Sequence, residues 1–176
     1  MMIGNRIPKD YFITSGCGES DITIHAGSYD FALEEAGIHN FNIITYSSIL
    51  PKSATRIEKP KEMVHGAVME TIMSVSNGTA GERITAGLIT GWIFDKKTNE
   101  KIGGLVAEYK GHDTEDNVKK ILKESINEMF QSRCGKKKDY ELRAMETIIR
   151  SFMPKKKYGT VIVAICFTSY EYPEID

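Results

Sequence analysis

The sequence of 176 residues is long enough for one domain with its own hydrophobic core, and its 41% hydrophobic and 27% charged residues are typical of globular proteins. The formal net charge of -1 provides no basic field that would attract nucleic acid or anionic lipid. No apolar run approaches the roughly 20 residues that cross a bilayer, and the first residues lack the apolar segment of a signal peptide. We therefore expect a single domain over residues 1–176 that is soluble and cytoplasmic, with no nucleic-acid or membrane partner.

The first third of the chain predicts short strands, a loop and a helix. Residues 11–15 predict a strand that runs into a glycine-rich loop, GCGES, at residues 16–20. A short helix is expected from about Ser28, with Gly37 at its end. Residues 41–47 predict the next strand, which is followed by a polar and irregular stretch.

Most of the following chain predicts strands. Residues 63–76 are β-like, and residues 83–95 and 101–111 flank a loop in the pattern of a hairpin. Near the end of the chain, residues 158–170 are apolar and rich in β-branched residues, which favours a central strand.

Two helices are expected between the hairpin and that last strand. Apolar residues recur at helical spacing in residues 114–133 and again in residues 139–153. The lysine runs 136–138 and 155–157 are interpreted as solvated helix ends, because no aromatic residues are interleaved with them. Together the elements predict the α+β class, a sandwich in which helices pack on a largely antiparallel sheet.

The cysteines and histidines offer neither a disulfide framework nor a metal site. The three cysteines lie far apart without a CxxC motif, and the four histidines lack a ligand spacing such as HExxH. Cys166 lies in the apolar run near the end of the chain and is expected to be a small core residue. The sequence therefore predicts no bound metal.

Two adjacent serines, Ser47 and Ser48, follow the strand predicted over residues 41–47. Serine is common where strands end, since its hydroxyl bonds the nearby backbone, and Pro51 would stop the pairing. The alternative is a nucleophile: Ser48 Oγ would attack the Ser47 carbonyl and move the acyl group from nitrogen to oxygen. Loss of the Ser48 α-proton would then release the N-terminal piece, and hydrolysis would leave ammonia and a pyruvoyl group.

A pyruvoyl group would be a cofactor formed from a residue of the chain itself, so that no separate cofactor is needed. Its ketone condenses with a substrate amine, and the Schiff base takes up the electrons that remain when CO₂ leaves. Such a site needs a donor for the cofactor carbonyl, an acid that protonates the carbanion and a counter-charge for the substrate side chain.

Several stretches of the sequence resemble the pyruvoyl-dependent arginine decarboxylases, over roughly residues 10–170. They are SYDFALEEAGIHNFNIITYSSILP, KIGGLVAEYKG and the terminal YGTVIVAICF, with GCGES and VHGAVMETIM resembling the bacterial members. The specific feature is the combination of N-x-N, a hydrophobic residue, S-S and P with a later E-Y-x-G. The resemblance implies that Ser48 becomes the pyruvoyl group and that cleavage after Ser47 yields a β chain, 1–47, and an α chain, 48–176.

The resemblance also implies roles for other residues. Glu108 would be the general acid, and Asn42 would hydrogen-bond the cofactor or the bond that is cleaved. Asp30 would pair with the substrate guanidinium, while Leu33 and Ile49 would shape the pocket. In the early glycine-rich loop, Gly18 or Ser20 would contact the substrate.

Each of these residues also has an ordinary structural interpretation. Glu108 would be an exposed carboxylate at a strand end, and Asp30 would favour the dipole of its helix. The Asn42 side chain would hydrogen-bond backbone groups at the edge of a strand, and Leu33 would be a core residue. The choice between these interpretations and the implied roles depends on where the fold places the side chains.

The resemblance further implies a four-layer α/β sandwich of the pyruvoyl-dependent histidine/arginine decarboxylase type. It implies a homo-oligomer, a trimer of cleaved protomers with shared active sites, that converts L-arginine to agmatine and CO₂. Because each turnover consumes a proton, acid resistance and polyamine supply are both compatible roles. Two alternatives stay open: a pyruvoyl decarboxylase of another amino acid, and an unprocessed, non-catalytic oligomeric binding protein.

Overall fold

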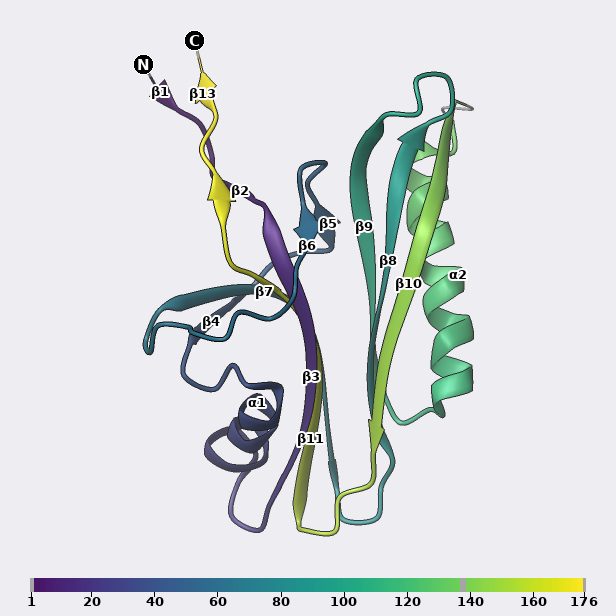
Figure 1. Cartoon of the computed structure of the whole chain (residues 1–176). Helices are drawn as coiled ribbons and strands as arrows, with labels where there is room; N and C mark the ends of the chain where they lie inside the picture. The colour runs from purple at the N-terminus through teal and green to yellow at the C-terminus, as the bar shows by residue number, and fades with distance from the viewer. Residues whose placement is uncertain (1, 137–138, 176) are drawn as a thin grey trace.

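The computed structural model describes residues 2–136 and 139–175, with side chains described for residues 4–136 and 139–174. Two β-sheets face each other, and each carries a helix on its outer face (Figure 1). The five-stranded sheet has the order β4 (Asn42–Thr45), β7 (Val68–Thr79), β11 (Tyr158–Phe167), β3 (Asp10–Ser20) and β6 (Thr55–Arg56). The four-stranded sheet has the order β10 (Tyr140–Phe152), β8 (Ile84–Asp95), β9 (Lys101–Gly111) and β5 (Ile49–Leu50).

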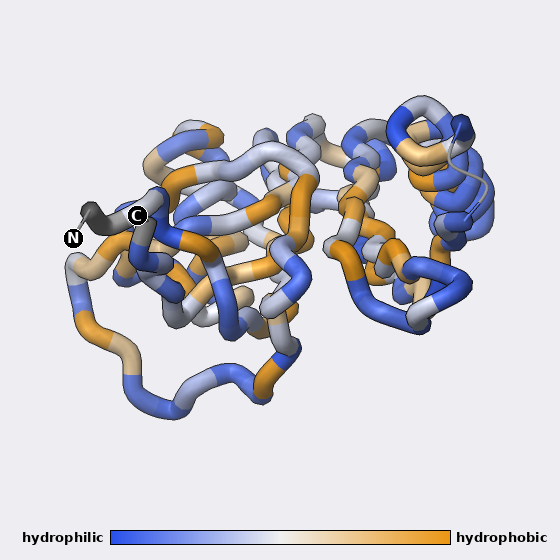
Figure 2. Tube along the Cα trace, turned by 90° about the horizontal axis from the view of Figure 1, so that it is seen from above, coloured by the Kyte–Doolittle hydropathy of each residue, from blue (hydrophilic) through white to orange (hydrophobic). Residues whose placement is uncertain are grey.

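The helices cover the two outer faces. A π-helical turn, η1 (Ile24–Tyr29), leads into α1 (Asp30–Ala36) on the five-stranded sheet, and α2 (Glu115–Cys134) covers the four-stranded sheet. In Figure 2 the hydrophilic residues of α2 lie on its outer side. Both chain ends lie together in two short ribbons, which pair β1 (Met2–Ile3) with β13 (Glu174–Ile175) and β2 (Ile7–Pro8) with β12 (Tyr170–Glu171).

Three apolar clusters fill the spaces between these layers, and they follow from the side-chain alternation of the strands. In β11, Val161, Val163 and Ile165 face the space between the sheets, whereas Ile162 and Ala164 face α1. A strand that is buried on both faces reads as a continuous apolar run, and β11 lies between β7 and β3 as predicted. The predicted α+β class is confirmed.

Several expected elements are found where the sequence predicts them. The hairpin of β8 and β9 is present, and α2 buries one apolar stripe. The early helix ends at Gly37, which has a φ of 68°, a left-handed conformation that glycine adopts without strain. Cys166 is fully buried, and this burial raises the pKa of its thiol to about 12. Among the described residues no helix is long and apolar enough to cross a membrane.

The predicted loop GCGES is wrong, because residues 16–20 continue β3 and pair with β11. The glycines are needed for close packing. A Cβ on Gly16 would lie 2.1 Å from the carbonyl oxygen of Ala32, and one on Gly18 would lie 2.1 Å from that of Ser28. Glycine here lets α1 approach the strand backbone, which is a use of glycine inside a strand rather than in a turn.

The predicted helix over residues 139–153 is also wrong, because these residues form β10, the edge strand beside β8. Its register shifts between Arg143 and Glu146, where one extra residue forms a β-bulge. The bulge reverses the alternation: Leu142 and Ile149, seven residues apart, both pack toward α2. This spacing imitates the repeat of a helix.

The lysine run 155–157 therefore does not end a helix as predicted, whereas Lys136 of the first run follows directly after α2 and its cap residue Gly135. The run 155–157 follows β10, and its backbone N–H groups donate hydrogen bonds to the carboxylates of Glu19 and Asp21. In the other run Lys136 is exposed, and residues 137–138 lie outside the described residues.

Replacing Gly16 with alanine is expected to destabilise the fold by about 3 kcal/mol, because the added Cβ would overlap the backbone of α1. Chemical denaturation followed by circular dichroism measures the loss. Gly103→Ala is a matched control in β9, where the nearest atom to the added Cβ would be 3.3 Å away. Equal stability of the two variants would contradict the packing argument.

Candidate active site

Residues 46–48 carry the chain from one sheet to the other, and we call them the crossover. The strand before them, β4, ends at Thr45 in the five-stranded sheet, and β5 begins at Ile49 in the four-stranded sheet. Both ends of the crossover are fixed by backbone hydrogen bonds. The Tyr46 N–H donates to the Thr71 carbonyl (2.6 Å), and the Val106 N–H donates to the Ser48 carbonyl (3.0 Å).

The peptide bond between Ser47 and Ser48 lies in a tight turn. The Ile49 N–H donates to the Ser47 carbonyl oxygen over 2.9 Å, so Ser48 is the central residue of a three-residue turn. Ser47 is exposed and Ser48 is half-buried. The turn places a backbone donor on the oxygen that would become negative during an attack by Ser48 Oγ.

Glu108 lies on β9, two residues beyond the Val106 that binds the crossover. At the usual rise of a strand this separation is about 7 Å. Glu108 is exposed, as its ordinary interpretation predicts, and it lines a cavity of about 290 Å³ together with Met73, Ser74, Val75 and Lys110. Partial desolvation of the carboxyl in this cavity raises the pKa of Glu108, and the positive charge of Lys110 opposes the rise. A raised pKa is what a proton donor requires.

Asn42 lies away from this turn within one chain. It begins β4, which extends about 10 Å to Thr45 before the crossover starts. Its side chain is exposed, and its Nδ2 donates to the carbonyl of Gly66 over 2.8 Å. In the isolated chain Asn42 therefore has the interaction that its ordinary interpretation predicts, at a strand end.

Three of the predicted substrate residues belong to the helical side of the five-stranded sheet. Asp30 is the first residue of α1 and is exposed, and its carboxylate has no side-chain partner among the described residues. Leu33 is 7% exposed and packs in the core beneath α1. Ser20 ends β3, where its buried Oγ accepts a hydrogen bond from the Ile22 N–H.

Ile49 is different, because it follows Ser48 directly and pairs with Leu105 of β9 while its side chain stays 42% exposed. One chain thus places Ser47, Ser48 and Ile49 in one turn beside β9, the strand that carries Glu108. It does not bring Asp30, Leu33 or Ser20 to them, since α1 lies on the outer face of the other sheet (Figure 1).

Sequence reasoning missed a second cavity that continues the Glu108 cavity. It has a volume of about 340 Å³ and shares Met73 and Val75 with the first; its other lining residues are Ile24, His25, Tyr29, Thr45 and Asn77. It opens where β4 ends, because β4 pairs with β7 only from Val68 to Thr71. A histidine and a tyrosine four residues apart in a helical segment were the available signal, but only the fold places them beside β7.

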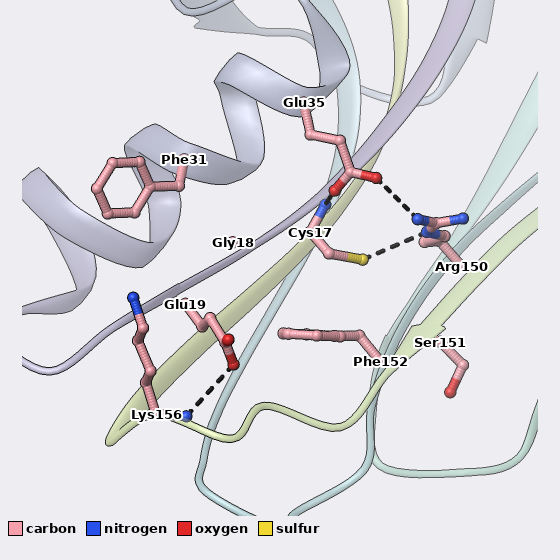
Figure 3. Close-up of a pocket in the computed structure, with 9 residues that line it drawn as sticks. All are labelled: Cys17, Gly18, Glu19, Phe31, Glu35, Arg150, Ser151, Phe152 and Lys156. Carbon is pink, nitrogen blue, oxygen red and sulfur yellow. Dashed lines mark hydrogen bonds and ion pairs between the residues drawn. The ribbon is translucent and has the colours of Figure 1, made fainter.

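A larger cavity, about 510 Å³, lies on the opposite side of the sandwich, between β3 and β10 (Figure 3). Its polar groups bind one another: the Glu35 carboxylate accepts hydrogen bonds from the Cys17 N–H and from Arg150, and Arg150 Nε lies 3.3 Å from Cys17 Sγ. Of the predicted site residues only Gly18 lines it. Among the described residues no group of histidine, cysteine and acidic side chains could hold a metal ion.

Comparison with known proteins gives a consistent result. A protein-family model described as "Pyruvoyl-dependent arginine decarboxylase" matches residues 10–172. The chain is 34% identical to the pyruvoyl-dependent arginine decarboxylase AaxB of Chlamydia pneumoniae, over 99% of this chain and 97% of the relative. It is 28% identical to the pyruvoyl-dependent arginine decarboxylase of Methanopyrus kandleri, over 92% of this chain and 97% of the relative.

Proposed function

Because the chain belongs to the pyruvoyl-dependent arginine decarboxylase family, we propose that it cleaves itself between Ser47 and Ser48 and then converts L-arginine to agmatine and CO₂. The observation that carries this proposal is the turn at Ser48. It holds the Ser47 carbonyl against a backbone N–H, beside the strand that carries a carboxyl group of raised pKa.

Self-cleavage uses the chain as its own substrate. Ser48 Oγ attacks the Ser47 carbonyl carbon, the Ser47–Ser48 C–N bond breaks, and the acyl group becomes an ester on Oγ while the amine takes the proton. The Ile49 N–H stabilises the charge on the carbonyl oxygen. Loss of the Ser48 α-proton expels the Ser47 carboxylate and leaves dehydroalanine. One water then yields the pyruvoyl group and ammonia, with residues 1–47 and 48–176 as the two chains.

The residues around position 48 fit such a group. The pyruvoyl group supplies an electron sink for the charge that remains when CO₂ leaves. Glu108 holds the proton that the product carbon requires, and its raised pKa keeps a larger fraction of the carboxyl protonated near neutral pH. Asn42 would donate from its amide to the cofactor carbonyl in the assembled enzyme.

The remaining predicted residues suit a site that is shared between subunits. Asp30 would bind the arginine guanidinium through a planar, bidentate contact, with the exposed Ile49 shaping the pocket. Leu33 and Ser20 are buried, so they would shape the site from beneath, by supporting the elements around Asp30. Since α1 and the crossover lie on different parts of one chain, Asp30 would reach Ser48 from a neighbouring subunit. We propose a trimer of cleaved protomers for this reason, and the exposed Ile44 beside the crossover supports it.

The order of the layers, helix, sheet, sheet and helix, supports the four-layer sandwich type of the pyruvoyl-dependent histidine/arginine decarboxylases (Figure 1).

Intact mass spectrometry of the denatured protein is the first test. We expect two chains that split between Ser47 and Ser48, the larger with the mass of an N-terminal pyruvoyl group rather than of serine. A single chain that stays uncut on long incubation would contradict the proposal and would favour a non-catalytic binding protein.

Asp30→Ala is expected to raise the KM for arginine about 10- to 100-fold, because a charge-assisted hydrogen bond to the guanidinium would be lost. Self-cleavage should proceed at its normal rate. Glu34→Ala removes a second exposed carboxylate from α1 and is the matched control. Unaltered arginine turnover in Asp30→Ala would refute the guanidinium contact and would favour a different amino acid as the substrate.

A further inference from the structure

Glu70 is a buried charged residue that the proposed reaction does not use. Its side chain is 1% exposed, and its only ion-pair partner among the described residues is Arg6, whose side chain is 50% exposed. Arg6 Nη2 donates a hydrogen bond to Oε1, whereas the buried Oε2 has no hydrogen-bond partner among the described residues.

Glu70 lies at the base of the crossover. On β7 it is in register with Ile44 of β4 on one side and with Phe167 of β11 on the other. The next residue, Thr71, accepts the hydrogen bond from the Tyr46 N–H that fixes the start of the crossover. The ring of Tyr46 packs on that of Phe167, with the ring centroids 5.9 Å apart.

Arg6 connects the same place to the ends of the chain. It lies between β1 and β2, and its guanidinium is 5.3 Å from the ring centroid of Tyr170 in β12. Tyr46 and Tyr170 both pack against the apolar cluster between the sheets. The ion pair therefore holds the strand ribbon at the chain ends over the end of the sandwich where the crossover lies.

Stability alone does not account for this pair. Burying the Glu70 carboxylate costs desolvation free energy that its half-exposed partner Arg6 offsets only in part, and one of its oxygens has no hydrogen-bond partner among the described residues. Besides stability, a buried charge can be retained because it holds the neighbouring backbone in one defined conformation. The neighbouring backbone here includes the scissile bond between Ser47 and Ser48, which follows Tyr46 directly.

We propose that Glu70 is a positioning residue for self-cleavage, which acts with Arg6 through Thr71, Phe167 and Tyr46 to hold the Ser47 carbonyl in the turn at Ser48. The inference rests on the proposed self-cleavage. Displacing a reacting group by about 1 Å costs on the order of 100-fold in rate. The pair thus contributes to the first, single-turnover reaction of the chain and not to the later decarboxylation.

The test measures the rate of self-cleavage in freshly refolded precursor by intact mass spectrometry. Glu70→Gln should slow the cleavage 10- to 100-fold, and Glu70→Asp, which keeps the charge, should recover part of the rate. Protein that has finally been cleaved should decarboxylate arginine with the normal kcat and KM. A merely structural role would instead lower the melting temperature, lower kcat and raise KM, without recovery by Glu70→Asp.

Two further variants keep the test decisive. Glu171→Gln removes the exposed Lys9–Glu171 ion pair, which also holds the N-terminal segment but joins it to β12 instead of β7, and should cleave at the normal rate. If Glu70→Gln does not fold, Arg6→Met/Glu70→Met removes both charges and should fold but cleave slowly. Normal cleavage in either folded Glu70 variant overturns the inference. An uncut wild-type chain would instead refute the proposed function itself.

Discussion

Replacing Ser48 with alanine is expected to give a protein that stays one chain of 176 residues and has no decarboxylase activity. Without Oγ there is no nucleophile at the turn, so neither the ester nor the pyruvoyl group forms. The fold should be retained, because Ser48 is only half-buried and its structural bond is made by the backbone carbonyl. Intact mass spectrometry and an assay of CO₂ release measure the two losses.

Ser47→Ala is the matched control, since it changes the neighbouring side chain and keeps the carbonyl that is attacked. It should cleave and then decarboxylate. Ser48→Cys should cleave slowly, because a thiol also accepts the acyl group. Cleavage of Ser48→Ala at the same bond would show that water or another residue is the nucleophile.

Glu108→Gln is expected to cleave itself normally and to lose about 10²- to 10⁴-fold in kcat, because glutamine cannot donate the proton. The pH dependence follows from the raised pKa of Glu108. The acid form is active, so kcat should hold at low pH and fall as the pH rises through that raised pKa.

A substitution of Lys110 is expected to shift the pH dependence of kcat. Its positive charge lowers the pKa of Glu108 against the effect of burial, so Lys110→Met should shift the fall in kcat to higher pH. An unchanged pH profile in Lys110→Met, or normal turnover in Glu108→Gln, would rule out Glu108 as the acid.

The fold could be predicted where one periodicity dominates a long segment. The stripe of α2 and the continuous apolar run of β11 belong to this class. The helix predicted over residues 139–153 failed because a bulge reverses the alternation of β10, and a bulge leaves no composition signal. The loop predicted at residues 16–20 failed because Gly16 serves the approach of α1, a tertiary contact that is far away in the sequence.

The candidate site divides in the same way. The cleavage site could be predicted because the nucleophile and the carbonyl that it attacks belong to adjacent residues, Ser48 and Ser47. Glu108 lies on β9, the strand whose backbone binds the crossover. Asp30 and Asn42 were implied by resemblance alone, and no spacing along one chain relates them to Ser48. Glu70 gave no signal, since a glutamate in a β-like run is usually on the solvent side; only the fold shows that it is buried.

The order of strands in the five-stranded sheet determines whether the two pieces of the cleaved protein can separate and refold. From one edge to the other, β4 comes from residues 1–47, β7 and β11 from residues 48–176, β3 from the first piece again and β6 from the second. The strands of the two pieces would alternate in one sheet, so neither piece could dissociate without breaking the backbone hydrogen bonds between neighbouring strands. Continuity of the chain would be needed once, as the template that brings the strands together, and denaturation after the cut would be irreversible.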